Sequence, residues 1–186
     1  MLIYDLEQGN SDQWIICLHG LKGNKDSVKQ ITSNLKNFNK LFVQAPIQLS
    51  DGEYTWFDEF GNLAANIDAD FIELLQRFKV SSTECWWLGF SQGGVVIFSL
   101  ANKLKISKVC ALCSFMLENL PDTYNGESLF WYSSLDDQQV SFSKSFSSFQ
   151  KAALKFNQTM FVTGKSGHKI SAKGLKALAF WVGVSM

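Results

Sequence analysis

The chain has 186 residues, of which 46% are hydrophobic, and its seventeen basic side chains balance seventeen acidic ones. This length is typical of one domain, so we expect a single domain over residues 1–186 with its own hydrophobic core. A net charge of zero argues against a partner with dense negative charge, and we expect no nucleic-acid partner. Aromatic residues make up 14% of the chain, which excludes a disordered protein.

The apolar segments are short and are interrupted by glycine, serine and charged residues. None approaches the ~18 consecutive apolar residues that a membrane span requires. The first twelve residues also lack the basic and apolar segments of a secretory signal. We therefore expect a cytoplasmic protein without integral membrane association.

Four cysteines occur, and Cys110 and Cys113 have the C-x-x-C spacing of redox pairs and zinc sites. The segment around them is typical of a β-strand, in which positions three apart point to opposite faces. No second Cys/His pair stands at ligand spacing. We interpret the cysteines as core residues and expect no metal site, with a thiol redox protein as the alternative.

Runs rich in β-forming residues recur along the chain and predict strands. They cover Trp14–Leu18, Leu41–Gln44, Cys85–Phe90, Val109–Ser114, Leu129–Ser133 and Thr159–Thr163, with a weaker run at Leu2–Leu6. The central runs are apolar throughout, which indicates strands buried on both faces.

Apolar residues at helical spacing separate these runs and predict amphipathic helices. The predicted helices cover Val28–Phe38, Leu63–Phe78, Gln92–Lys103, Phe142–Ala153 and Leu175–Val182. In the fourth we expect the serines of Ser141–Ser148 on the outer face. The alternation predicts an α/β fold, a mostly parallel sheet of six to seven strands with helices on both faces. In such sheets ligands bind beyond the carboxyl ends of the strands.

A candidate nucleophile lies at one of these ends. Residues 89–94 read Gly-Phe-Ser-Gln-Gly-Gly and contain the pattern G-x-S-x-G, between a predicted strand and a predicted helix. That context is the sharp turn that exposes a serine hydroxyl above a sheet. The helix N-terminus beneath it stabilises negative charge. We therefore predict that Ser91 is a nucleophile, the alternative being a serine that caps the helix.

A serine hydroxyl needs a base, and the chain has only two histidines. On this scaffold the order is serine, acid, histidine. His168, after the last predicted strand, is therefore the predicted base, with a surface-loop histidine as the alternative, and His19 belongs to an earlier element. Asp136 and Asp137 follow the strand between Ser91 and His168, and either could be the acid.

An oxyanion hole needs two backbone donors. One is the N–H of Gln92, which directly follows the predicted nucleophile. The other comes from the loop after the strand Trp14–Leu18, where we choose the N–H of Leu21 because Gly20 lets the main chain approach closely.

With these residues placed, the chain resembles the α/β-hydrolase fold and, within it, the compact carboxylesterase, lysophospholipase and acyl-protein thioesterase family. The resemblance runs from Leu18–Leu21 (Leu-His-Gly-Leu) to His168, and residues 89–94 match the family's nucleophile turn without alteration. It implies no metal or organic cofactor. Trp56-Phe-Asp58 matches a family segment near the acyl-binding side, which assigns Trp56 a substrate-lining role. A rim or core aromatic is the alternative.

The chain also departs from the family's pattern. Lys22 stands where a glycine is usual, and Ser133-Ser134 stand where His-Gly usually precedes the acid. Aligning on Val140 selects Asp137 as the acid and leaves Asp136 as the alternative. The segment 116–127, where insertions would cap the site, is short, so we expect a cleft with a minimal lid.

These expectations combine into one function. The chain is predicted to be a serine hydrolase with a Ser-His-Asp triad that cleaves small acyl esters or thioesters through an acyl-enzyme. The alternative is a catalytically silent binding protein on the same fold. The sequence specifies neither the natural acyl group nor the oligomeric state.

Overall fold

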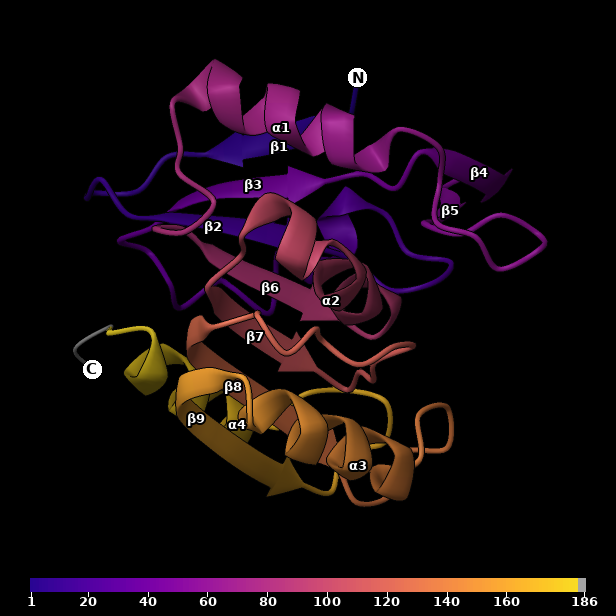
Figure 1. Ribbon diagram of the computed structural model, residues 1–186, viewed down its shortest axis with the longest axis vertical. Coiled ribbons are helices and arrows are strands. Elements are labelled where there is room, and N and C mark those ends of the chain that lie inside the picture. The colour runs from indigo at the N-terminus through magenta and orange to yellow at the C-terminus, as the bar shows by residue number, and fades with distance from the viewer. Residues whose placement is uncertain (184–186) are drawn as a thin grey trace.

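A computed structural model describes residues 1–183 (Figure 1). Seven strands form the main sheet in the order β1-β3-β2-β6-β7-β8-β9. Their bounds are β1 Tyr4–Glu7, β2 Trp14–Leu18, β3 Asn39–Val43, β6 Trp86–Phe90, β7 Lys108–Leu112, β8 Gly126–Ser134 and β9 Phe156–Gly164. β1 runs antiparallel to β3, and the other neighbouring pairs are parallel. The predicted mostly parallel sheet is confirmed.

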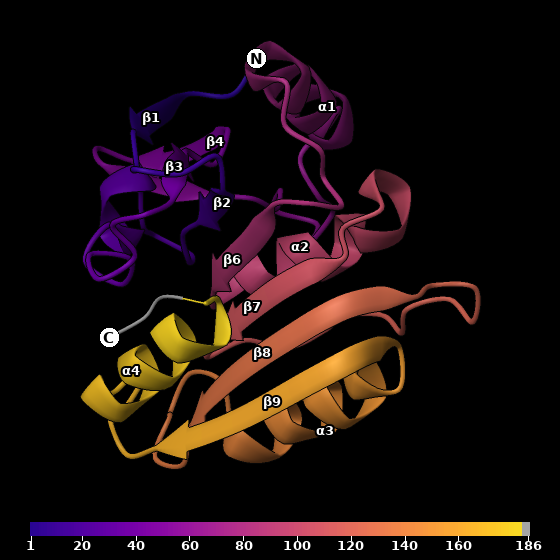
Figure 2. The same ribbon diagram turned by 90° about the vertical axis from the view of Figure 1, so that its left-hand side faces the viewer.

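Helices cover both faces of the sheet, as predicted (Figure 2). Three helices pack on one face: α1 (Ile67–Phe78), α2 (Gln92–Leu104) and α3 (Phe142–Ala153). The other face carries α4 (Ala172–Trp181) and the short 3-10 helix η1 (Lys25–Val28). Consecutive strand residues such as Ile15 and Ile16 belong to different core clusters, because side chains of a strand alternate between its faces.

The helix predicted over Val28–Phe38 is wrong. η1 ends at Val28, and successive turns follow in which backbone hydrogen bonds join residues three apart, such as Thr32 N–H to the Lys29 carbonyl. The hydroxyls of Thr32 and Ser33 also donate to the carbonyls three residues earlier. Such local bonds compete with an α-helix. Three of the four apolar residues behind the prediction are nevertheless buried, so their spacing indicated burial and not a helix.

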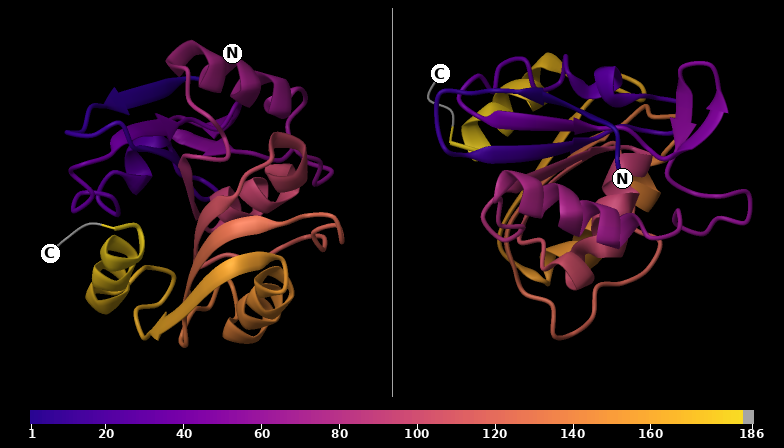
Figure 3. Two further views of the ribbon diagram at one scale, coloured as in Figure 1. Left: turned by 60° about the vertical axis from the view of Figure 1, so that its left-hand side comes forward. Right: turned by 90° about the horizontal axis from the view of Figure 1, so that it is seen from above.

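A small hairpin was not predicted. It consists of β4 (Ile47–Ser50) and β5 (Glu53–Thr55) and lies beyond the carboxyl ends of the central strands (Figure 3). The helix that follows it, α1, begins at Ile67 and not at Leu63 as expected. Residue Leu63 instead pairs with Phe57 in an isolated antiparallel bridge, which belongs to the loop beside the hairpin.

The serine-rich helix α3 has the predicted bounds but not the predicted outer face. Ser145 is buried, and its hydroxyl accepts the indole N–H of Trp131 at 2.9 Å. Ser148 is buried as well, and it accepts the backbone N–H of Met116 at 3.1 Å. Hydroxyls satisfied in this way can face the core, so only part of the serine set lies on the outside.

Two further features bear on the site. The connection from β7 to β8, residues 113–125, contains neither helix nor strand. Within residues 1–183, no helix has both the length and the apolar character needed to cross a membrane.

Candidate active site

The predicted nucleophile lies in a strained turn between β6 and α2. Ser91 has φ 51° and ψ −117°, a conformation that is costly for any residue other than glycine. Its backbone N–H donates to the carbonyl of Leu112 at 2.8 Å, and its carbonyl accepts the hydroxyl of Ser114 at 2.8 Å. The end of β7 therefore holds the turn in place, which matches the strand-to-helix turn of G-x-S-x-G enzymes.

Two glycines of the turn allow close backbone packing. A Cβ at Gly89 would lie 2.3 Å from the backbone nitrogen of Gly94. A Cβ at Gly93 would lie 2.3 Å from the carbonyl oxygen of Leu18, at the end of β2. No side chain fits at these distances, so the pattern G-x-S-x-G is a packing requirement of this turn.

The predicted base and one predicted acid form a pair. His168 Nδ1 lies 2.7 Å from Asp137 Oδ2, and the side chain of Asp137 is 1% exposed. The other oxygen of this carboxylate accepts the backbone N–H groups of Gln139 and Val140 at 2.8 and 3.0 Å. An Nδ1–H donated to a fixed carboxylate leaves Nε2 of the ring as a proton acceptor.

The imidazole lies beside the nucleophile turn. The rings of His168 and Phe90 have centroids 5.0 Å apart, and Phe90 immediately precedes Ser91 in the chain. The structure therefore brings the His168–Asp137 pair to the same edge of the sheet as the predicted nucleophile.

Asp136 has a different position. Its Oδ1 accepts the hydroxyl of Ser134 at 2.7 Å. The same oxygen accepts the backbone N–H groups of Ser166 and Gly167, each at 2.9 Å. The bonds from Ser134 and then Gly167 hold the pKa of Asp136 below its usual range. Asp136 therefore anchors the loop that carries His168, whereas the neighbouring aspartate contacts the ring.

The predicted oxyanion loop follows β2. The N–H of Lys22 donates to the carbonyl of Tyr54 at 3.0 Å, and the N–H of Tyr54 donates to the carbonyl of Gly23 at 3.0 Å. These two bonds join the loop to β5. Lys22 has a left-handed φ of 60°, the conformation for which a glycine is usual at this position. A Cβ at Gly20 would lie 3.2 Å from Cβ of Ser91, so the loop directly adjoins the nucleophile.

The two predicted oxyanion donors line one hollow. Gln92 is the first residue of α2, so its N–H has no carbonyl of a preceding helical turn as an acceptor. Within residues 1–183, the N–H of Leu21 has no backbone partner. Both residues line a hollow of about 540 Å³ together with Ile47, Leu49 and Phe57. This hollow lies between the end of β2 and the β4–β5 hairpin.

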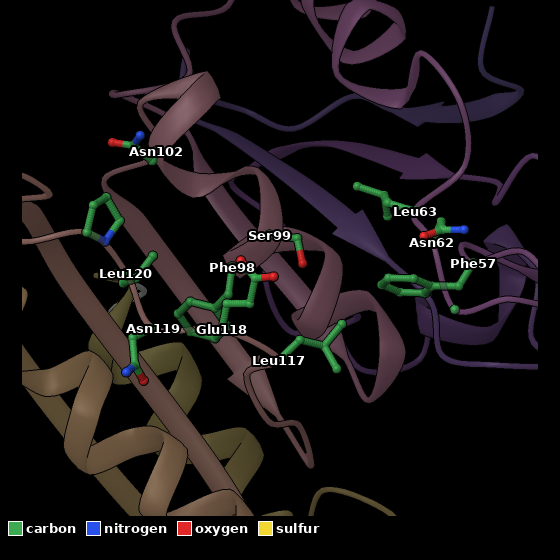
Figure 4. A pocket seen from close by; sticks show the side chains of 12 residues that line it. Phe57, Asn62, Leu63, Phe98, Ser99, Asn102, Leu117, Glu118, Asn119 and Leu120 are labelled. Carbon is green, nitrogen blue, oxygen red and sulfur yellow. The ribbon is translucent and has the colours of Figure 1, made fainter.

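A second hollow of about 470 Å³ lies on the outer side of α2 (Figure 4). Phe98 and Ser99 lie near its centre, between Leu63 and Phe57 on one side and Leu120 and Asn119 on the other. Its lining includes neither the predicted nucleophile nor the predicted base. The hollow beside Leu21 is also lined by neither of them, but its lining includes Gln92, which directly follows Ser91 in the chain.

The structure corrects the role predicted for Trp56. Its side chain is 0% exposed and stacks on Phe71 in the core, with ring centroids 6.2 Å apart. The indole N–H donates to the carbonyl of His19 at 2.9 Å, and the backbone N–H donates to the side-chain oxygen of Gln92 at 3.1 Å. Trp56 thus lies in the core, as in the alternative interpretation, and ties the loop that follows β2 to the start of α2.

We expect the substitution Trp56→Phe to lower kcat/KM about fivefold, because one hydrogen bond is worth ~1 kcal/mol and the loop loses a fixed position. Steady-state kinetics and thermal unfolding measure the two effects. Trp87→Phe is the matched control, since Trp87 is fully buried and its indole N–H has no hydrogen-bond partner within residues 1–183. Equal effects of the two variants on kcat/KM would contradict the positioning role.

His19 is a structural residue of the same loop. It is fully buried, its Nδ1 lies 2.7 Å from the carbonyl oxygen of Gly20, and its Nε2 accepts the backbone N–H of Ala45 at 3.0 Å. Nδ1 therefore carries the proton, and the ring is neutral. Burial lowers the pKa of His19 below its usual 6.5.

This pKa predicts a loss of stability in mild acid. Below pH 6.5 the unfolded chain binds a proton at His19 that the folded chain does not, so stability is complete above pH 6.5 and falls as the pH decreases from there. The slope reaches at most about 1.4 kcal/mol per pH unit, the value for one proton. Denaturant unfolding in the His168→Ala background isolates this residue. A slope that persists in His19→Gln/His168→Ala would contradict the assignment.

Sequence reasoning missed one neighbour of the acid–base pair. Cys113, with φ 49°, directly follows β7, and its sulfur and the nearest ligand atoms of Asp137 and His168 lie within 4.8 Å of one another. Burial raises the pKa of its thiol to about 12, and Sγ donates to the carbonyl of Lys169 at 3.5 Å. The position directly after a central strand was the available signal. All four cysteines are buried and free, which confirms the core interpretation.

The chain was compared with known proteins. No protein-family model matches it, and no curated protein matches it in sequence. Among solved structures, that of YahD with malic acid matches this chain with a TM-score of 0.83 at 17% sequence identity. The match covers 98% of this chain and 98% of the YahD chain. The Bacillus cereus carboxylesterase has a TM-score of 0.81 at 14% identity and covers 100% of this chain and 95% of its own.

Arabidopsis thaliana SOBER1 has a TM-score of 0.69 at 18% identity, over 91% of this chain and 97% of its own. Similarity at such low identity is evidence for the fold and not for a particular activity. Together with the mostly parallel sheet and the strained turn after β6, these similarities show that the chain has the α/β-hydrolase fold.

Proposed function

We propose that the protein is a serine hydrolase that cleaves carboxylic esters or thioesters through an acyl-enzyme on Ser91. One observation carries the proposal: the imidazole of His168, bonded to Asp137 at 2.7 Å, packs on the residue that precedes a serine in a strained turn. The similarity to structures that include a carboxylesterase supports the same activity.

The first half of the reaction forms the acyl-enzyme. Ser91 Oγ attacks the carbonyl carbon while Nε2 of His168 takes the hydroxyl proton. Asp137 holds the ring in its Nδ1–H tautomer and stabilises the imidazolium. The proton then passes from Nε2 to the leaving alcohol or thiol as the carbon–oxygen or carbon–sulfur bond breaks.

The second half releases the acid. Water attacks the acyl-enzyme, His168 takes one of its protons, and that proton returns to Ser91 Oγ as the acyl–oxygen bond breaks. In both halves the N–H groups of Leu21 and Gln92 bind the tetrahedral oxyanion. Each donor of this kind lowers the barrier by about 3 kcal/mol.

The hollow beside the oxyanion donors is the proposed substrate site. Its apolar wall comes from Leu21, Ile47, Leu49 and Phe57, and its volume of about 540 Å³ suits a small or medium apolar group. The β7–β8 connection carries no helix that would cover it. We propose that short acyl esters or thioesters are the preferred substrates.

Turnover of short-chain p-nitrophenyl esters, with acyl thioesters measured in parallel, tests this function. We expect Ser91→Ala to lower kcat about 10⁶-fold, as in other serine triads, and His168→Ala to have a comparable effect. Ser99→Ala, a change of an exposed serine on α2, is the matched control and should retain full activity. A wild-type protein without turnover would leave the non-catalytic binding protein as the function, and a fully active Ser91→Ala variant would show that Ser91 is not the nucleophile.

A further inference from the structure

β9 forms an open edge of the sheet. Its nine residues pair with β8 on one side only. Within residues 1–183, no backbone hydrogen bond outside the β8–β9 ladder engages residues 157–163. A row of unpaired N–H and C=O groups on a long strand is a template for pairing with another strand.

This edge lacks the features that usually prevent such pairing. Residues 157–163 read Asn-Gln-Thr-Met-Phe-Val-Thr and include no charged residue and no proline. Their register with β8 is continuous, without a bulge. Inward-pointing charges, prolines and bulges are the common means of blocking an edge strand, and β9 has none of them in this segment.

The opposite edge of the sheet is protected. β1 has only four residues, Tyr4–Glu7, and includes Asp5 and Glu7. The carboxylate of Asp5 pairs with Lys25 at 2.7 Å and with Lys29 at 2.5 Å. The chain therefore blocks one edge with a short, charged strand and leaves the other edge long and neutral.

An aromatic cluster lies beside the open edge. Phe142, Phe146 and Phe149 of α3 surround Phe161 of β9, with the rings of Phe149 and Phe161 at 4.6 Å and those of Phe146 and Phe161 at 5.2 Å. All four side chains are only partly buried. Figure 2 shows α3 running along β9 at this end of the molecule. The accessible parts of these rings add apolar surface beside the open edge.

We propose that β9 pairs antiparallel with β9 of a second copy of this chain, around a two-fold axis near the middle of the strand. Such a pair is self-complementary, because each copy presents the same row of donors and acceptors in the opposite direction. The two sheets become continuous, and the aromatic clusters of both copies lie on the same face.

The absence of charged residues in 157–163 suits a second copy as the occupant, because two such strands bring no like charges together. The net charge is zero, so two copies do not repel each other over distance. Lys155, at one end of the strand, is already paired with Asp122 at 2.7 Å. A stable interface buries about 800 Å² on each partner, so we expect the aromatic clusters to contribute apolar area beside the strand pair.

The arrangement leaves the proposed catalytic edge free. The strands of the two copies run in opposite directions across the interface, so their carboxyl ends point to opposite ends of the dimer. Pairing through β9 therefore does not depend on the proposed function, and its test does not use activity.

Sedimentation velocity over a micromolar to submillimolar range tests the proposal. We expect a dimer of twice the 20.9 kDa chain mass that Thr159→Lys weakens at least about tenfold, because the two-fold axis places the added charge in the interface twice. Thr159 is exposed, so circular dichroism should show a folded variant. Gln158→Lys, also on the exposed part of β9, is a second disrupting variant should the first fail to fold.

Gln76→Lys adds the same charge on the exposed side of α1, far from β9, and should leave the dimer intact. Hydrogen exchange should show protected amides in residues 157–163 of the dimer and faster exchange in Thr159→Lys. A protein that stays monomeric at every concentration overturns the proposal. So does a dimer that both β9 variants leave unchanged or in which these amides exchange freely.

Discussion

Asp137→Asn is expected to lower kcat about 10⁴-fold, the effect of the corresponding change in other serine triads. The carboxylate lies 2.7 Å from Nδ1 of His168, and an amide there would favour the wrong tautomer of the ring. The backbone N–H groups of Gln139 and Val140, which bond Oδ1 of Asp137, also hold an asparagine oxygen. The loss should therefore appear in kcat, with the fold retained.

Asp136→Asn is the matched control, because it removes the neighbouring carboxylate with the same chemical change. Asp136 is exposed and bonds the backbone of the loop that carries His168. Exposed charges of this kind contribute little to the stability of the loop that they hold, so we expect kcat to fall by less than about tenfold. Steady-state kinetics with one ester measures both variants. A larger loss in Asp136→Asn than in Asp137→Asn would contradict the assignment of the acid.

Gly93→Ala is expected to lower kcat/KM by about 10²- to 10³-fold, the effect of losing one oxyanion donor. Its Cβ would lie 2.3 Å from the backbone carbonyl oxygen of Leu18, so the first turn of α2 must move away from the end of β2. The first turn of α2 carries the N–H of Gln92 and the loop that follows β2 carries the N–H of Leu21, so the movement separates the two groups. Overpacking of this kind also costs about 1–3 kcal/mol of stability.

A second glycine separates the geometric effect from the loss of stability. Gly61 has φ 81°, and a Cβ there would meet no atom within 4 Å. Gly61→Ala is therefore strained by about 1 kcal/mol without displacing any neighbour. We expect it to lower the melting temperature but to keep kcat/KM within about twofold of wild type. If both glycine variants lose activity in proportion to stability, the account of the oxyanion geometry is wrong.

The sequence predicted the main sheet and its order of elements because burial on both faces leaves a clear pattern. Apolar runs such as Ile15–Leu18 and Cys85–Leu88 are buried. Gly93 is required by the carbonyl of Leu18 in a distant segment, but the nucleophile turn was predictable for a similar reason, since Gly89 is required by backbone contacts with Gly93 and Gly94. Local constraints of this kind are present in the sequence itself.

Other features depend on contacts between distant segments. Residues 28–38 have apolar residues at helical spacing, but serine and threonine hydroxyls bond their own backbone, and turns replace the helix. Trp56 matched a substrate-lining segment, yet its indole N–H is used by the carbonyl of His19, 37 residues away. Asp136 and Asp137 are adjacent in sequence, and only the folded loop shows which of them contacts His168.

Covalent labelling of the nucleophile tests the central claim most directly. A fluorophosphonate probe reacts with a serine that has an activated hydroxyl, and peptide mass spectrometry identifies the modified residue. We predict one adduct on Ser91, no labelling of Ser91→Ala, and much slower labelling of His168→Ala. An adduct on another residue, or labelling that persists unchanged in Ser91→Ala, would contradict the account.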